Sequence, residues 1–284
     1  MVDRRFHVHP LFWLMMLFSL LAGQFLQVIT LFIIVMIHEA GHVAAAVYYG
    51  WRVKRIELLP FGGVAEVDEW GNTSPVEEVV TALAGPLMNG LLILAGKLLE
   101  TWGIWSSEWT AFFVYSNVLI GGFNLLPIWP LDGGRVMQTA YSLLLPYRTA
   151  ITASIYTSGV GALLLVAWSV AQPAVHFNGL AVACYLFFSN IMAYRQSHYQ
   201  FMRFLLFRYG QVDELDGKLP HRSVRISPSL SLLELTKKIK RNYYHTFLVE
   251  AASSSPPETL SEKHLLYSYF DKKRPHCTVE QLLR

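Results

Sequence analysis

Residues 10–50 of the chain are PLFWLMMLFSLLAGQFLQVITLFIIVMIHEAGHVAAAVYYG, an apolar run in which Glu39 is the single formal charge. One α-helix of this length would be about 60 Å long at 1.5 Å per residue, twice the roughly 30 Å hydrocarbon core of a bilayer. We therefore expect two membrane spans, at 10–27 and 29–50, separated near Gly23-Gln24. This stretch alone indicates an α-helical membrane protein.

The same apolar pattern continues to residue 194. Further spans are expected at 79–99, 109–127, 150–171 and 177–194, which makes about six in all. Over the 284 residues, 53% are hydrophobic and 15% are charged, against roughly 25% charged in a typical soluble domain. The composition excludes disordered, coiled-coil and collagen chains. The two cysteines, Cys184 and Cys277, lie too far apart in different surroundings to suggest a disulfide scaffold.

Charge is unevenly distributed along the chain. Residues 1–194 carry 8 Lys/Arg and 11 Asp/Glu, a net −3, whereas residues 195–284 carry 15 and 9, a net +6. With six spans, the basic residues near the membrane gather on the side of the two termini, and the opposite side has only Lys97. The positive-inside rule therefore predicts that both termini are cytosolic. The overall net charge of +3 is too small to suggest direct nucleic-acid binding.

The segment His38-Glu39-Ala40-Gly41-His42, inside the second predicted span, has the H-E-x-x-H pattern. Residues four apart share one face of a helix, so both imidazoles can bind one Zn²⁺, and Glu39 beside them can act as a general base. Ionisable residues within a span are costly in lipid and usually mark function. The alternative is a histidine pair that only joins helices through hydrogen bonds. That alternative would leave Glu39 buried without a cationic partner.

A third ligand is expected, because catalytic zinc usually has three protein ligands and an open position. The best candidate is Asp132, in NLLPIWPLDGG at residues 124–134. Pro127 and Pro130 interrupt the fourth span, and irregular backbone at that depth is tolerated only where protein or a cavity covers it. The alternative is that Asp132 only caps the helix expected at 135–145.

HEAGH in one span and N-x-x-P-x-x-P-L-D-G-G at the end of a later one together resemble the site-2 protease family of intramembrane zinc metalloproteases. The resemblance covers about residues 5–200 and includes HVHP at 7–10, WRVKRIELLPFGG at 51–63 and AGPL at 84–87. It is stronger still to the sporulation branch, the stage IV protease that processes the mother-cell sigma-factor precursor (pro-sigma-K). Zn²⁺ is then the expected cofactor.

This resemblance implies a role for particular residues and partners. His38, His42 and Asp132 would be the metal ligands, Glu39 the catalytic residue, and Asn124 would lie near the substrate backbone. It also implies a membrane-associated pro-sigma factor as substrate and inhibitory membrane proteins as partners. The protein would reside in the membrane surrounding the forespore, facing the mother cell. From its chemistry alone, Asn124 either orients the substrate carbonyl or bonds the proline-broken backbone.

Two further segments invite a functional interpretation. In IELLPFGGVAEVD at 56–68, two β-type runs flank Pro60-Phe61-Gly62-Gly63, which predicts a turn or a short membrane-dipping β-hairpin. Its strand edge could pair with an extended substrate, which makes Phe61, Gly62 and Gly63 candidate substrate contacts; the alternative is an ordinary cytosolic hairpin. The pattern Gly85-Pro86-x-x-Asn89 resembles one of the wider family, but we interpret it as a packing kink.

The C-terminal part of the chain is polar. Residues 195–219 are expected to form a basic amphipathic linker along the inner leaflet, between a transmembrane zinc protease domain at 1–194 and a small cytosolic α/β domain at 220–284. In this domain we expect a strand, a helix with Leu232, Leu235 and Ile239 on one face, a strand ending at Val249, and helices at 260–270 and 278–283. It resembles a single CBS module, which implies a homo-oligomer or a contact with the substrate, and ATP or another adenine nucleotide as a candidate ligand. Purely structural docking is the alternative.

The favoured interpretation is an intramembrane zinc endopeptidase that removes the pro-segment of a sporulation sigma-factor precursor. One alternative is a nucleotide-regulated divalent-metal transporter, which would tend to show internal repeats and several polar positions along one path. Another is a non-catalytic membrane regulator, in which Glu39 would be dispensable.

Overall fold

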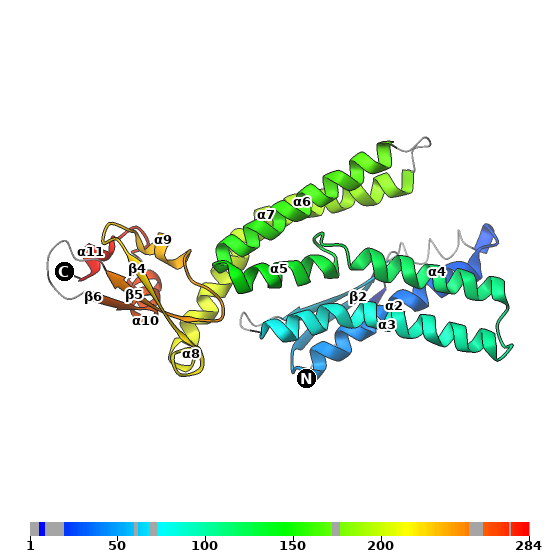
Figure 1. Cartoon of the computed structure of the whole chain (residues 1–284), viewed down its shortest axis with the longest axis horizontal. Helices are drawn as coiled ribbons and strands as arrows, with labels where there is room; N and C mark the ends of the chain where they lie inside the picture. The colour runs from blue at the N-terminus through cyan, green and yellow to red at the C-terminus, as the bar shows by residue number, and fades with distance from the viewer. Residues whose placement is uncertain are drawn as a thin grey trace. The chain divides into compact units, whose positions relative to one another are not determined.

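The computed structural model describes residues 6–8, 20–59, 62–68, 73–171, 177–249, 258–272 and 274–283. The chain divides into two compact units, Met1–Val136 and Met137–Arg284, and each has its own packing (Figure 1).

Three of the described helices are long and apolar enough to cross a membrane: α2 (Phe25–Tyr48), α3 (Pro75–Thr101) and α6 (Tyr147–Ala171). Helix α2 begins directly after Gly23-Gln24, where the sequence predicts a break. The predicted span at 10–27 lies largely outside the described residues. The membrane character of the chain is thus confirmed, whereas the count of six spans and the cytosolic side of the termini stay predictions.

The first unit is built around α2, α3 and α4 (Ser107–Asn124), in which α3 packs against both of the others (Figure 1). Helix α3 starts with Pro75 after Ser74, which suits proline because the first helical N–H has no partner within the helix. The Ser106 side chain caps α4 by accepting a hydrogen bond from the Trp109 N–H. An irregular segment, 125–131, then leads to α5 (Asp132–Leu144) and includes a cis Trp129–Pro130 bond.

A small sheet completes this unit, with β1 (Phe6–Val8), β2 (Arg52–Leu59) and β3 (Gly62–Asp68) in that order. Strand β1 is parallel to β2, and β2 pairs with β3 in an antiparallel hairpin, so a hairpin is present where the sequence predicts one. Gly62 and Gly63 belong to β3, opposite Leu59 and Leu58, rather than to the turn. Strand β3 also packs against α2.

In the second unit, α6 packs along α7 (Phe177–Gly210) as a helical hairpin (Figure 1). Small side chains permit the close approach, and those buried on α6 include Ala150, Ser154, Ser158 and Ala162. Helix α7 does not end near residue 194 but continues to Gly210, and α8 (Val212–Lys218) follows. The predicted linker is therefore mostly the second half of one long helix.

The C-terminal segment folds as a mixed sheet with short helices: β4 (His221–Ile226), α9 (Leu232–Thr236), β5 (Tyr244–Val249), β6 (Glu258–Ser261), α10 (Glu262–Phe270) and α11 (Val279–Leu283). Strand β5 is central, parallel to β4 and antiparallel to β6. The predicted strand–helix–strand order is confirmed, and Leu232, Leu235 and Ile239 are fully buried. The sequence prediction missed β6, which takes the first residues of the helix expected at 260–270.

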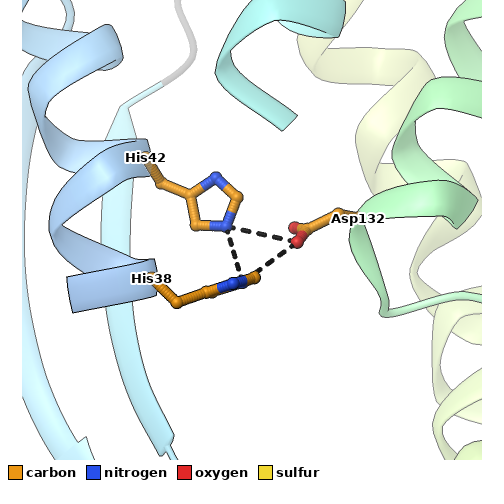
Figure 2. Close-up of side chains that lie close together, drawn as sticks. All are labelled: His38, His42 and Asp132. Carbon is orange, nitrogen blue, oxygen red and sulfur yellow. Dashed lines mark hydrogen bonds and ion pairs between the residues drawn. The ribbon is translucent and has the colours of Figure 1, made fainter. Parts of the chain in front are cut away.

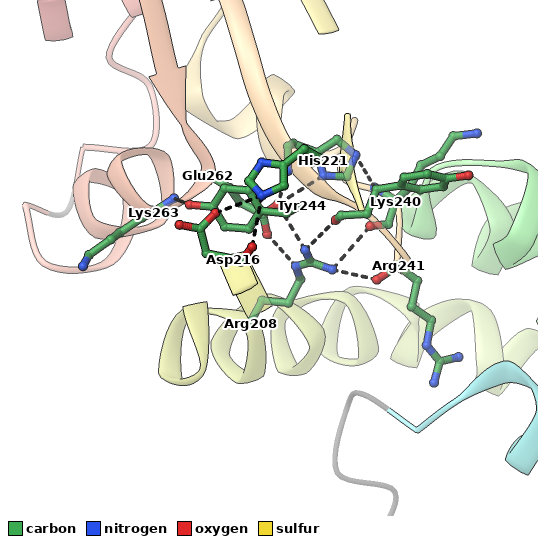
Figure 3. Close-up of polar contacts among 10 residues, drawn as sticks. Arg208, Asp216, His221, Lys240, Arg241, Tyr244, Glu262 and Lys263 are labelled. Atoms are coloured by element: carbon green, nitrogen blue, oxygen red, sulfur yellow. Dashed lines mark hydrogen bonds and ion pairs between the residues drawn. The ribbon is translucent and has the colours of Figure 1, made fainter. Parts of the chain in front are cut away.

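Arg208 joins the end of α7 to the core of this domain (Figure 3). The side chain has no exposed surface, and its Nε and Nη2 donate to the two carboxylate oxygens of Glu262 at 2.5 and 3.1 Å. Its other N–H groups donate to the carbonyls of Arg241 and Tyr243, both at 2.8 Å. The prediction that residues 195–219 lie along the inner leaflet as a basic linker is thus wrong for Arg208, which is fully buried. Its guanidinium is needed instead to satisfy buried oxygens.

Glu262 also pairs with His245, which is equally buried. The backbone N–H of Lys240 donates to His245 Nε2 at 3.2 Å, so Nδ1 carries the imidazole proton and faces Glu262 Oε2 at 3.1 Å. Burial by itself would raise the pKa of Glu262, but the hydrogen bond from His245 and the positive charge of Arg208 outweigh it and hold that pKa below its ordinary value.

The C-terminal domain should therefore lose stability in acid. A carboxyl with a lowered pKa in the folded state contributes stability above its unfolded pKa, and loses it as the pH falls through the folded value. For Glu262 the loss should begin below its ordinary pKa of 4.5. Urea unfolding of the full chain at a series of pH values, followed by hydrogen exchange within β5, measures it. A Glu262→Gln variant should be less stable at neutral pH and should show a shallower decline; an equally steep decline would contradict the assignment.

Candidate metal centre

Two turns of α2 place His38 and His42 on one face of the helix, toward Asp132 at the start of α5 (Figure 2). The side chain of His38 is 3% exposed, and those of His42 and Asp132 are each 13% exposed. The i, i+4 spacing makes the histidines neighbours whatever the rest of the fold does. The position of Asp132, in contrast, depends on how the chain returns after α4.

The three side chains present one ligand atom each to a common point. His38 Nε2 lies 3.2 Å from His42 Nε2, and each of these nitrogens lies 3.2 Å from Asp132 Oδ2. Two ligands about 2.0 Å from a tetrahedral zinc ion are about 3.3 Å apart, so this triangle has the dimensions of a zinc site. The donor set of two imidazoles and one carboxylate also suits zinc.

Hydrogen bonds behind the histidines turn their Nε2 atoms toward this point. His42 Nδ1 lies 2.7 Å from the carbonyl oxygen of Thr81, which can only accept, so Nδ1 carries the proton. His38 Nδ1 lies 2.6 Å from Asn89 Oδ1 in the same manner. Asp132 Oδ2 is buried, and the described residues give it no hydrogen-bond donor. Three lone pairs thus converge, an arrangement that a cation stabilises, and the residues fit the metal.

The segment before α5 aims the Asp132 carboxylate. A Cβ at position 133 would lie 2.1 Å from the Leu125 carbonyl oxygen, and one at position 134 would lie 2.7 Å from the backbone of Ile128. Glycine at both positions therefore lets α5 start directly against the irregular segment. The N–H groups of Gly134 and Arg135 donate to the Leu131 carbonyl, and the Asp132 side chain points to the histidines (Figure 2).

Gly85 leaves room for the ligand nitrogens on the α3 side. A Cβ at this position would lie 2.3 Å from His42 Nε2 and 2.7 Å from His38 Nε2. Even one methyl group there would occupy space that the two imidazoles and a bound ion need. The G-P-x-x-N pattern interpreted as a packing kink therefore lines the metal centre, through Gly85 and through Asn89 behind His38.

Of the other predicted site residues, Glu39 lies next to the histidines on α2, whereas Asn124 and the hairpin residues lie on other segments. Glu39 lies on α2 between the histidines, and its electrostatic neighbours are His38, His42, Asp132 and Arg135. Asn124 ends α4, and its amide donates to the Ile120 carbonyl at 3.0 Å, as in the backbone-bonding interpretation. Phe61 lies outside the described residues, and Gly62 and Gly63 are paired in β3.

Thr81, Gly85, Asn89 and Asn117 complete the centre, and sequence reasoning gave none of them a role in it. A signal for the asparagines was present, because amide side chains inside apolar spans need hydrogen-bond partners. For Thr81 only the backbone carbonyl takes part, which no residue-type pattern can reveal.

Comparisons with known proteins agree with this geometry. The family model described as peptidase family M50 matches residues 26–99 and 93–167. The chain is 35% identical over 280 residues to stage IV sporulation protein FB of Bacillus subtilis, covering 98% of this chain and 96% of that protein. It is 36% identical over 135 residues to a zinc metalloprotease of Methanocaldococcus jannaschii, covering 45% of this chain and 38% of the relative. The solved site-2 protease from M. jannaschii shares the fold, with a TM-score of 0.52 at 24% identity over 66% of this chain and 89% of that one.

Proposed function

Because the chain belongs to peptidase family M50, the site-2 protease family, and is thus a membrane zinc metalloendopeptidase, we propose that it cleaves a membrane-associated sigma-factor precursor. His38, His42 and Asp132 hold the zinc ion, and Glu39 is the catalytic residue. The observation that carries the zinc site is the 3.2 Å triangle of the two histidine Nε2 atoms and Asp132 Oδ2, in which both imidazoles carry their hydrogen on Nδ1.

The reaction is the addition of water across a peptide bond. A zinc ion held by His38, His42 and Asp132 would supply the Lewis acidity that makes water nucleophilic and the scissile carbonyl electrophilic at neutral pH. Glu39 accepts a proton as the water oxygen attacks the carbonyl carbon, and delivers it to the leaving nitrogen when the C–N bond breaks. Thr81 and Asn89 keep both imidazoles aimed while the charge at the centre changes.

Substrate must reach this centre in extended form, because a helix engages its own peptide groups. Strand β3 supports this step, since it is the last strand in the order β1-β2-β3 and packs against α2, which carries the histidines. An extended segment that pairs with β3 near Gly62 and Gly63 would run close to the zinc-binding helix. Phe61 is proposed to contact it, together with the Oδ1 of Asn124, whose Nδ2 donates to the Ile120 carbonyl.

The substrate class follows from the sporulation relative. Similarity to stage IV sporulation protein FB over nearly the whole chain supports removal of the pro-segment of a sigma-factor precursor. By the same relation, the protein acts in the membrane around the forespore, facing the mother cell, under the control of inhibitory membrane proteins. The CBS-like nature of residues 220–284, its adenine nucleotide and pairing of protomers stay predictions from the sequence.

The test is cleavage of the precursor co-produced in membranes with the wild-type chain, with Glu39→Gln or with Glu100→Gln. Glu39→Gln should retain zinc and lose on the order of 10²–10⁴-fold in rate, the usual contribution of a general base. Glu100 is a matched control, because it pairs with Lys97 at the end of α3, away from the ligands, and its variant should cleave normally.

Zinc content of all three purified proteins completes the experiment. Undiminished cleavage by Glu39→Gln would refute the proposed mechanism. A wild-type enzyme that holds zinc and cleaves another membrane peptide, but not the precursor, would refute the substrate assignment instead.

A further inference from the structure

Two asparagines lie buried between the helices of the first unit. Asn89 on α3 is 1% exposed and Asn117 on α4 is fully buried. Their amides bond to each other, with Asn89 Nδ2 donating to Asn117 Oδ1 at 3.0 Å. A buried amide without hydrogen-bond partners is costly, so the remaining polar atoms of this pair also need partners. On the Asn89 side, the partner is the His38 imidazole.

On the Asn117 side, the partner is a backbone carbonyl. This carbonyl fixes the direction of each hydrogen bond from Asn117 through Asn89 to His38. Asn117 Nδ2 lies 2.9 Å from the carbonyl oxygen of Phe113, which can only accept a hydrogen bond. Asn117 must therefore turn its Oδ1 toward Asn89. Asn89 must then present Nδ2 to Asn117, and its own Oδ1 to His38.

The tautomer of His38 follows from this sequence of bonds. With Asn89 Oδ1 only 2.6 Å away, His38 Nδ1 must carry the hydrogen, which leaves the Nε2 lone pair free for a metal. Were the Asn89 amide turned over, its NH₂ group would face Nδ1 and favour the tautomer with hydrogen on Nε2. That tautomer cannot bind zinc until the hydrogen leaves.

We infer that Asn117 is a positioning residue of the metal centre, which sets the tautomer of His38 through Asn89. It acts from α4, through its hydrogen bond to Asn89. The inference rests on the proposed zinc site. It assigns to the packing of α4 against α3 a chemical role beyond stability, because the contact between the two asparagines decides which end of the Asn89 amide faces the histidine.

The test measures zinc affinity of the purified full-length chain by competition with a chelator. Asn117→Leu removes the acceptor for Asn89 and leaves its amide free to turn over, so affinity should fall by about 10–100-fold, the usual effect of losing a partner behind a ligand. Asn117→Ala removes the same acceptor with a smaller side chain, and serves if the leucine variant does not fold.

A second substitution separates this role from simple packing. Asn89→Asp offers an acceptor oxygen to His38 whichever way the carboxylate turns, so it makes the orientation set by Asn117 redundant. The double variant Asn89→Asp/Asn117→Leu should therefore bind zinc more tightly than Asn117→Leu alone. A packing defect at position 117 would not be rescued in this way. Asn190→Leu is the control, because Asn190 is a buried amide on α7 that donates to the Leu186 carbonyl at 2.8 Å; its affinity should not change.

Each outcome decides one question. Loss in Asn117→Leu with rescue in the double variant supports the inference. Wild-type affinity in Asn117→Leu, or equal loss in the single and double variants, overturns it. Failure of the wild-type chain to bind zinc would overturn the proposed function itself, a result distinct from either.

Discussion

A Gly85→Ala variant should bind no zinc and cleave no substrate, although its helices still form. The added methyl group would lie 2.3 Å from His42 Nε2 and 2.7 Å from His38 Nε2, well inside contact distance. The imidazoles cannot turn aside without breaking the hydrogen bonds of their Nδ1 atoms to the Thr81 carbonyl and Asn89. The ligand triangle must therefore open, and a tetrahedral ion loses at least one bond.

Gly90→Ala is the matched control for this prediction. Gly90 lies on the same helix, one residue beyond Asn89, and a methyl group there meets nothing within 4 Å. Replacing glycine by alanine in a helix interior is favourable by up to about 1 kcal/mol, so this variant should be as stable as the wild type or more so. Zinc content and precursor cleavage are measured for both. A Gly85→Ala protein with a full complement of zinc would show that the ligand positions described above are wrong.

Arg208→Ala should lower the free energy of unfolding of the C-terminal domain by about 3–5 kcal/mol, the cost of leaving one partner of a buried ion pair alone. The substitution leaves the Glu262 carboxylate without its guanidinium partner, and leaves the carbonyls of Arg241 and Tyr243 without its donors. It also removes the cation above the Phe204 ring, 5.6 Å from its centroid.

Peptide-resolved hydrogen exchange of the full-length protein in urea measures this effect at β5 and α10. Lys218→Ala is the control, because Lys218 pairs with Glu214 at 3.0 Å on the surface, where the two side chains are 71% and 65% exposed. Exposed pairs of this kind contribute little to stability. If Arg208→Ala were no more destabilising than Lys218→Ala, the ion pair would not hold α7 to the domain.

Continuity of α7 gives this ion pair a wider consequence. The predicted span at 177–194 and the residues that enter the domain core, Phe201, Phe204, Leu205 and Arg208, belong to one unbroken helix. The Tyr147 N–H at the start of α6 also donates to the Ile239 carbonyl at 3.0 Å. The domain is therefore attached to both helices of the α6–α7 hairpin rather than tethered by a loose linker.

Local patterns made much of the site predictable. The i, i+4 spacing places His38 and His42 on one face of a single helix, whatever the rest of the chain does. The apolar run around them can likewise be identified as a membrane span from the local sequence. Asp132 could be selected because acidic residues are scarce near the spans and prolines mark the irregular segment before it. For Asn124 the sequence left two roles open, and the hydrogen bond to the Ile120 carbonyl agrees with the backbone one.

Arg208 shows why local sequence patterns are not sufficient. The basic residues of the segment 195–219 predict a surface along the inner leaflet, because basic residues there meet anionic lipid. Burial of Arg208 requires Glu262 and two carbonyl groups from segments 33 to 54 residues away. No local window contains them.

The sequence by itself determined the membrane character of the chain, the histidine pair with Glu39 between them, and the class of chemistry that these residues support. Tertiary structure alone decided that Gly85 gives the two imidazoles room, that the Thr81 carbonyl and Asn89 bond to them, that Asn117 bonds to Asn89, and that Arg208 is buried. The physical reason is distance along the chain. A helix dictates which of its own residues share a face, but contacts across helices depend on which faces pack together, and only the assembled fold fixes that.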